Sequence, residues 1–188
     1  MKKPAVFMDR DGTVNEQMGY INHLSRFVLL PGAGQAIRLL NEAGYLAIIV
    51  SNQSGVARGY FPIDLVYRVH DKMKTIIKED GAALDGIYFC PHYPNGKFPP
   101  YGMKCDCRKP GIGLIEAACN SFDIDMENSY VIGDRCTDIE MAHKAGLKGI
   151  LVKTGYGMGD LEYVFPEFSF QPFHVAEDLL DAVKWILG

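Results

Sequence analysis

Residues 5–13 read Ala5-Val6-Phe7-Met8-Asp9-Arg10-Asp11-Gly12-Thr13, a short apolar run followed at once by a turn with two carboxylates. A continuous apolar run is typical of a strand that is buried on both faces of a parallel sheet. Ligands of open parallel sheets bind beyond the carboxyl ends of the strands, where Asp9 and Asp11 would stand. The segment therefore predicts a parallel α/β sheet with a polar site at one edge.

Further apolar runs of strand length follow along the chain and alternate with helical patterns. The runs cover 46–50, 86–89, 130–132 and 149–152, and the helical patterns cover 31–43, 63–79, 113–121, 138–145 and 176–187. This alternation is typical of a three-layer, Rossmann-like parallel sheet with helices on both faces. We expect a single domain over residues 1–188. No separate cap domain is expected, because the stretches after Asp11 and after Ser51 are too short to fold alone.

Composition and charge exclude several classes of protein. The chain has 188 residues, of which 48% are hydrophobic and 22% charged, as in ordinary globular domains. Its net charge of -4 and the lack of a basic block argue against a nucleic-acid partner. The apolar run near the start is too short for a signal peptide or a membrane span, so we expect a cytoplasmic protein without a membrane partner.

Polar and charged side chains follow the other expected strands. A hydroxyl and amides follow the second run, carboxylates follow the fourth, and two cations precede a helix: Ser51, Asn52, Gln53, Ser54, Asp134, Asp138, Arg108 and Lys109. Each group alone has a plain alternative, as turn carboxylates or helix-capping residues. Together with Asp9 they make up the carboxylates, hydroxyl and lysine that phosphoryl transfer requires.

The loop over about 90–108 contains four candidate zinc ligands. Cys90 and His92 form one close pair, and Cys105 and Cys107 form another after twelve intervening residues. Three thiolates and an imidazole match a tetrahedral structural zinc site with no position open to water. Chance burial is the alternative, but so polar a loop has little apolar area with which to order itself.

Zinc would also fix the cations beside Cys107, namely Arg108 and Lys109. We therefore expect a zinc-stapled loop that is indirectly needed for activity. Five cysteines without an export signal argue against disulfides. Cys119 and Cys136 are predicted to be buried or partly buried thiols outside the zinc site.

The ordered motifs resemble the haloacid dehalogenase superfamily of phosphohydrolases. They are Asp9-x-Asp11-Gly12-Thr13, Ser51-Asn52, Lys109-Pro110, and Gly133-Asp134 with Asp138 four residues later. The resemblance implies an aspartyl-phosphate on Asp9, with Asp11 as general acid and base. It implies that Ser51 and Lys109 contact the transferring phosphoryl group. It also implies Mg²⁺ held by Asp9, Asp134 and the backbone carbonyl of Asp11. For Asp138, orientation of a metal-bound water or of the loop and a plain role in the first helical turn both stay open.

The zinc loop narrows the resemblance to a branch that looks like the D-glycero-D-manno-heptose 1,7-bisphosphate phosphatases and the similar histidinol-phosphate phosphatases. The twelve-residue spacer fits the heptose branch better. The resemblance implies Mg-dependent removal of the 7-phosphate from the heptose bisphosphate. Alternatives are a histidinol-phosphate phosphatase, a 3′-phosphatase on nucleic acid, or a non-catalytic zinc-stapled interaction module.

The same branch implies which residues line the substrate. They are Gln17, Met18, Gly19, Tyr20, Asn52, Gln53, Ser54, Arg108 and Arg135. Ser51 and Arg135 stand where the heptose branch often has Thr and Lys, so distal recognition is expected to differ while the chemistry is retained. The expected partner is a small phosphorylated sugar, bound by a monomer.

Overall fold

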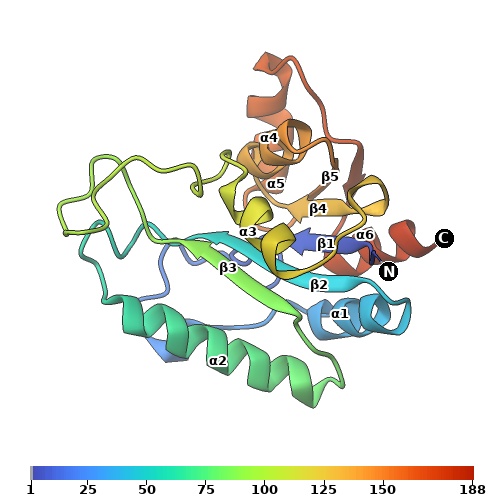
Figure 1. Cartoon of the computed structure of the whole chain (residues 1–188), viewed down its shortest axis with the longest axis horizontal. Coiled ribbons are helices and arrows are strands. Elements are labelled where there is room, and N and C mark those ends of the chain that lie inside the picture. The colour runs from blue at the N-terminus through green and yellow to red at the C-terminus, as the bar shows by residue number, and fades with distance from the viewer. Residues whose placement is uncertain (1) are drawn as a thin grey trace.

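The computed structural model describes residues 2–188, and within them six parallel strands form one sheet (Figure 1). Along the sheet the strands lie in the order β3-β2-β1-β4-β5-β6. Their bounds are β1 Ala5–Met8, β2 Leu46–Asn52, β3 Gly86–Cys90, β4 Tyr130–Gly133, β5 Lys148–Val152 and β6 His174–Ala176. The predicted α/β class with a parallel sheet is confirmed.

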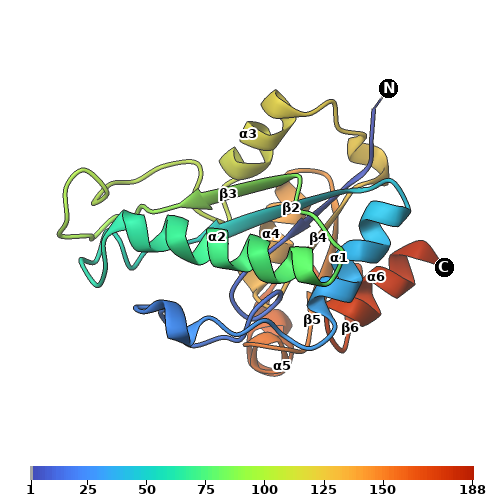
Figure 2. The same ribbon diagram turned by 90° about the horizontal axis from the view of Figure 1, so that it is seen from below.

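Helices cover both faces of the sheet (Figure 2). One face carries α1 Ala33–Glu42, α2 Ile63–Glu79 and α6 Leu179–Leu187, and the other carries α3 Gly113–Ser121 and α4 Cys136–Lys144. Side chains of β1 alternate between these layers. Val6 and Met8 pack in the core under the first set of helices, whereas Ala5 and Phe7 pack in the core under the second. Both faces of the strand are therefore buried, which explains its continuous apolar sequence.

The structure differs from the sequence prediction near the C-terminus. A sixth strand, β6, occupies 174–176, and the last helix begins at Leu179 instead of Ala176. The side chain of Asp178 caps that helix by accepting a hydrogen bond from the backbone N–H of Asp181 at 2.8 Å. A three-residue strand is too short to show a periodicity, so sequence patterns miss it.

Two smaller differences concern helix ends and short helical segments. The first helix begins at Ala33 rather than Pro31, because Gly32 adopts a left-handed conformation with φ of 78° immediately before it. The segment after β5 forms α5 Gly157–Gly159, then a π-helix over Asp160–Val164 and a 3₁₀ turn over Phe165–Glu167. Further 3₁₀ turns lie at Leu24–Arg26 and Met126–Asn128.

The carboxyl ends of the strands bring the predicted motifs to one edge. Asp9 directly follows β1 and donates its backbone N–H to the carbonyl of Ile132 in β4 at 2.9 Å. Asn52 ends β2 and is in register with Cys90, which ends β3. Within residues 2–188 no separate cap domain occurs, and the edge is bordered by loops and by the first turn of α4. No helix in the same range is long and apolar enough to cross a membrane.

Candidate active site

Four ionisable side chains from three segments of the chain meet at this edge of the sheet. Nζ of Lys109 lies 2.7 Å from Oδ1 of Asp9 and 2.6 Å from Oδ1 of Asp138. The same ammonium donates to the carbonyl of Val50 at 2.9 Å. Asp134 follows β4, and carboxylate oxygens of Asp9, Asp134 and Asp138 all lie within 4.8 Å of one another. Three carboxylates and one lysine therefore share a buried site.

Burial raises the pKa of two of these carboxyl groups. The pKa of Asp134 rises to about 8, first through burial and then through the neighbouring Asp9 and Asp138. Burial also raises the pKa of Asp9 to about 6, although Lys109 opposes the shift. Burial alone would lower the pKa of Lys109, but Asp138 and Asp9 raise it, so the lysine stays charged. One ammonium for three carboxylates leaves negative charge that a bound cation would neutralise.

The carboxylates fit a hard divalent cation. Oδ1 of Asp134 is buried and, within the described part of the chain, has no hydrogen-bond partner. Its Oδ2 accepts a hydrogen bond from the backbone N–H of Tyr156 at 2.8 Å. The backbone closes tightly around this carboxylate, since a Cβ atom on Gly12 or Gly155 would collide with it. Carboxylate oxygens are the ligands that Mg²⁺ takes in proteins, so the donor set fits this ion.

The carboxylate of Asp11 lies in a separate network beside the cluster. Nη2 of Arg10 donates to its two oxygens at 2.9 and 2.8 Å. Asn15 donates to it at 3.0 Å and Gln53 at 2.8 Å. Burial would raise the pKa of Asp11, but the Arg10 charge and the hydrogen bonds together lower it. The amide of Gln53 also donates to Oγ of Ser51 at 2.8 Å, which links the Ser51 hydroxyl to Asp11.

A cavity of about 360 Å³ opens above the carboxylates. Most of the predicted substrate residues line it, namely Gln17, Gly19, Tyr20, Asn52, Gln53, Ser54, Arg108 and Arg135. Met18 is not among the lining residues, and Ser51 is buried beside the amide of Gln53. Sequence reasoning missed Ile21, Thr137 and Tyr156, which complete the walls. They carry no motif, so only their positions could have indicated them: Ile21 lies between β1 and α1, Thr137 follows β4 and Tyr156 follows β5.

Arg135 is held at the cavity wall by two contacts. Its Nε donates to Oδ2 of Asp160 at 3.1 Å, and its guanidinium lies 4.6 Å from the centre of the Tyr156 ring. The same oxygen of Asp160 accepts a hydrogen bond from the backbone N–H of Cys136 at 2.7 Å, at the start of α4. Asp160 is buried, so it fixes both the helix end and the cation.

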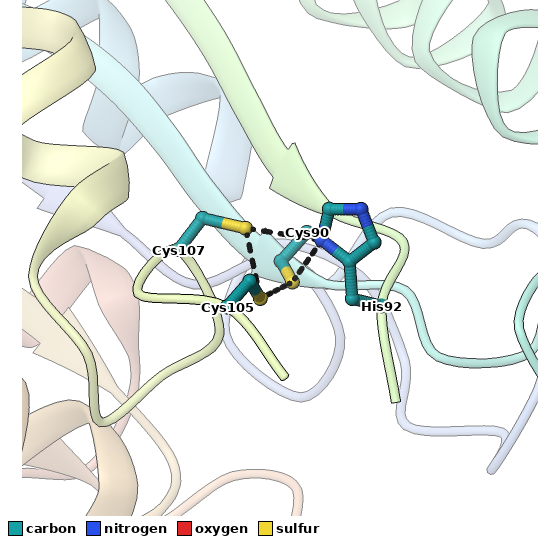
Figure 3. A group of neighbouring side chains, drawn as sticks. All are labelled: Cys90, His92, Cys105 and Cys107. Carbon is teal, nitrogen blue, oxygen red and sulfur yellow. Dashed lines mark hydrogen bonds between the residues drawn. The ribbon is translucent and has the colours of Figure 1, made fainter. Parts of the chain in front are cut away.

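The four predicted zinc ligands converge at the end of β3 (Figure 3). Sγ of Cys105 lies 3.4 Å from that of Cys90 and 3.2 Å from that of Cys107. Nδ1 of His92 lies 3.7 Å from Sγ of Cys90 and 3.4 Å from Sγ of Cys107. In a tetrahedral site the sulfur ligands of zinc would lie roughly 3.8 Å apart. The observed sulfur spacings are somewhat shorter, and all four ligand atoms lie within 4.8 Å of one another, so the cluster is compatible with a zinc site. Nη1 of Arg108 donates to the carbonyl of His92 at 3.2 Å, so the loop positions this cavity cation.

Asp138 contacts both the start of α4 and the carboxylate cluster. Its Oδ2 accepts a hydrogen bond from the backbone N–H of Arg135 at 3.1 Å, as part of a capping box in the first turn of α4. Its Oδ1 contacts the ammonium of Lys109. The residue therefore joins the helix end to the carboxylate cluster.

The prediction for Cys119 is wrong, because its side chain is exposed. On α3 the residues Leu114, Ile115 and Ala118 face the core, and Cys119 lies just past that stripe with Sγ 3.7 Å from Sδ of Met126. Cys136 is buried, as predicted.

Comparisons with known proteins place this arrangement among phosphatases. A sequence profile of the HAD-hydrolase-like family matches residues 106–182. A D-glycero-D-manno-heptose-1,7-bisphosphate 7-phosphatase of Thermosynechococcus vestitus is 44% identical over 99% of this chain and 96% of its own length. A D-glycero-beta-D-manno-heptose-1,7-bisphosphate 7-phosphatase of Haemophilus ducreyi is 45% identical over 82% of this chain and 86% of its own. The crystal structure of a D,D-heptose 1,7-bisphosphate phosphatase from B. bronchiseptica, complexed with magnesium and phosphate, has a TM-score of 0.85 at 32% identity and covers 100% of this chain and 98% of that one.

Proposed function

This chain belongs to the heptose-bisphosphate phosphatase family of HAD-like hydrolases, and on that premise we propose that it removes the 7-phosphate of D-glycero-D-manno-heptose 1,7-bisphosphate. The observation that carries the proposal is the placement of the Asp9–Lys109 pair in a cavity that is also lined by Arg108 and Arg135. A bisphosphate needs one site for the reacting phosphate and separate cations for the distal one.

The proposed reaction begins with attack by a carboxylate oxygen of Asp9 on the phosphorus of the 7-phosphate. A bond from this oxygen to phosphorus forms while the bond from phosphorus to the sugar oxygen breaks, and Asp11 gives its proton to that oxygen. Water then attacks the aspartyl-phosphate and passes a proton to Asp11. Inorganic phosphate leaves and the Asp9 carboxylate is restored.

Lys109 and Ser51 would stabilise the charge on the phosphoryl oxygens during both steps. Asp11 must carry a proton for the first step, whereas its contacts with Arg10, Asn15 and Gln53 favour the ionised form that the second step needs. The first step therefore requires proton uptake by Asp11 when substrate fills the cavity.

We assign Mg²⁺ to the side chains of Asp9 and Asp134 and the backbone carbonyl of Asp11. When bound, the ion would offset the repulsion between the anionic nucleophile and the anionic phosphate. The buried, unpartnered oxygen of Asp134 supports this assignment. The relative from B. bronchiseptica was itself crystallised with magnesium and phosphate.

We assign structural zinc to Cys90, His92, Cys105 and Cys107. Four protein ligands close the coordination sphere, which is typical of zinc that stabilises a loop. The contact from Arg108 to the carbonyl of His92 supports an indirect role in substrate binding.

Histidinol phosphate is the closest alternative substrate. Its organic part carries an amine, which the guanidinium groups of Arg108 and Arg135 would repel, whereas a second phosphate would be attracted. Phosphate release from both anomers of the heptose bisphosphate, from histidinol phosphate and from hexose phosphates tests the proposal. We expect the largest kcat/KM for the heptose bisphosphate, and a larger value for histidinol phosphate would contradict the assignment.

A further inference from the structure

Arg10, which contacts Asp11, forms a buried pair with His70, and His70 has no part in the reaction as proposed above. Arg10 is 1% exposed and His70 is 4% exposed. His70 lies on α2, and its ring packs edge-on against Phe89 with the ring centres 5.3 Å apart. A guanidinium has five N–H donors and a permanent charge, so its burial requires an anion and several acceptors.

One side of the guanidinium faces the carboxylate of Asp11. Nη2 donates to both of its oxygens, at 2.9 and 2.8 Å, and Nε lies 3.3 Å from Oδ1. Nη2 also donates to Oε1 of Gln53 at 3.2 Å. On the other side, Nη1 lies 3.2 Å from Nε2 of His70. Arg10 therefore bridges a ring on helix α2 and the carboxylate that moves protons in the proposed reaction.

His70 has to be the acceptor in this contact, because arginine offers only donors. Nε2 must then carry the lone pair, with the ring neutral. Burial, followed by the charge of Arg10, lowers the pKa of His70 to about 3 despite the opposing effect of Asp11. The ring thus remains neutral around pH 7 and keeps its acceptor.

We propose that His70 is a positioning residue for phosphoryl transfer, holding the Asp11 carboxylate in place through the guanidinium of Arg10. The inference rests on the proposed function, in which Asp11 carries the protons. Without this acceptor, the N–H groups of Nη1 lose a buried hydrogen-bond partner. The guanidinium then turns toward another acceptor and displaces Asp11. Neither His70 nor Arg10 lines the cavity, so the effect on substrate is indirect.

The test compares leaving groups in the first turnover, measured by rapid mixing with enzyme in excess. The two substrates are heptose bisphosphate and 4-nitrophenyl phosphate. The sugar oxygen of the first must gain a proton to leave, whereas the 4-nitrophenolate of the second leaves without one. His70→Met removes the acceptor, and His70→Gln keeps an oxygen that can accept from Arg10. Met73→Leu, at a buried position on the same helix, is the matched control. All assays contain saturating Mg²⁺, and the folding of each variant is checked by thermal unfolding.

We expect His70→Met to slow the first turnover of heptose bisphosphate by about tenfold or more, a part of the 10²–10⁴ that acid–base catalysis supplies. Release of 4-nitrophenolate should stay within about twofold of wild type, because it needs no proton. His70→Gln should recover most of the sugar-phosphate rate, and Met73→Leu should match wild type on both substrates. Equal slowing of both substrates by His70→Met, or of neither, overturns the assignment.

Asp11→Asn separates this inference from the proposed function. If Asp11→Asn slows both substrates alike, the acid role of Asp11 is wrong, and the role of His70 falls with it. If Asp11→Asn slows only the sugar phosphate, whereas His70→Met slows both substrates or neither, only the inference about His70 is wrong.

A measurement on the wild-type protein decides the case even if His70→Met does not fold. ¹⁵N-labelled histidine should show His70 as the neutral tautomer with an unprotonated Nε2 at neutral pH, and the signal is assigned by its absence in His70→Gln. A proton on Nε2 would rule out acceptance from Arg10 and overturn the proposal.

Discussion

The ammonium of Lys109 contacts the carboxylate of Asp9 at 2.7 Å, although 100 positions separate the two residues in the chain. Both side chains are buried, so water screens their interaction weakly. In the proposed reaction the same cation faces the attacking oxygen and the phosphoryl oxygens.

Replacing Lys109 by Met should therefore lower kcat by about 10²–10³-fold, the usual loss for one electrostatic contact to a transition state. Phosphate release at saturating heptose bisphosphate measures this. Lys74→Met is the control, because that lysine is exposed, pairs with Asp71 and does not line the cavity. Turnover of Lys109→Met within a few fold of wild type would remove the lysine from the mechanism.

Asp9→Asn should abolish turnover and leave the protein folded. The amide has no nucleophilic carboxylate, and it removes one of three crowded, buried negative charges, so the unfolding midpoint of the metal-free protein should be equal or higher. Phosphate release and thermal unfolding measure the two effects. A non-catalytic zinc module would instead show no phosphate release in the wild type and no change in any measured property of the variant.

Metal analysis of protein purified without chelator should give about one zinc per chain. Cys107→Ser should lose most of it and raise KM for heptose bisphosphate, because the loop that carries Arg108 is no longer held. Cys119→Ser is the matched control, since this exposed cysteine lies outside the cluster and the variant should keep both its zinc and its KM. Equal zinc contents in the two variants would contradict the site.

Arg135→Ala should raise KM for the bisphosphate by about tenfold or more, because a charge-assisted hydrogen bond contributes about 1.5–3 kcal/mol. KM for a simple hexose monophosphate should change little, since the distal phosphate is missing. Arg38→Ala, at an exposed arginine on α1, serves as the control. The same increase in KM for both substrates would mean that Arg135 acts on the reacting phosphate instead.

The metal-free protein should become less stable as the pH rises from about 6 to 8, and the dependence should flatten above about pH 9. The folded-state pKa of Asp134 is raised to about 8 from an ordinary value of 3.8, so between these two values the native state holds a proton that the unfolded chain has lost. Stability falls with pH wherever the native state holds more protons. Thermal unfolding of wild type and Asp134→Asn in EDTA checks this, and the variant should show a flatter dependence.

Added Mg²⁺ should reverse this trend. The ion competes with protons for Asp134, so its stabilising effect should be greater at about pH 9 than at pH 7. Asp134→Asn should lose most of the stabilisation by Mg²⁺. Identical Mg²⁺ effects at both pH values would contradict the assignment of Asp134 as a ligand.

Much of the fold could be predicted from the sequence. A strand that is buried on both faces is a continuous apolar run, and a helix on the core has apolar residues at every third or fourth position. Asp9 and Asp134 directly follow such runs, so their shared edge could be predicted. The cluster of Cys90, His92, Cys105 and Cys107 could also be predicted, because a cysteine-rich pattern in a polar loop is typical of a metal site. The monomeric state and the cytoplasmic location stay predictions.

Only the tertiary structure could show which side chains touch. Contacts between distant segments pair Lys109 with both Asp9 and Asp138. Such contacts also join Asp160 to Arg135 and His70 to Arg10. Strand β6 is likewise formed by pairing with β5 and not by its own three residues. Sequence by itself determined the buried strands, the apolar helix faces and the chemical groups that follow the strands, because those depend on local pattern and residue type. The partner of each buried charge was decided by packing of the whole chain, since a buried ion must find its counter-charge wherever the fold brings one near.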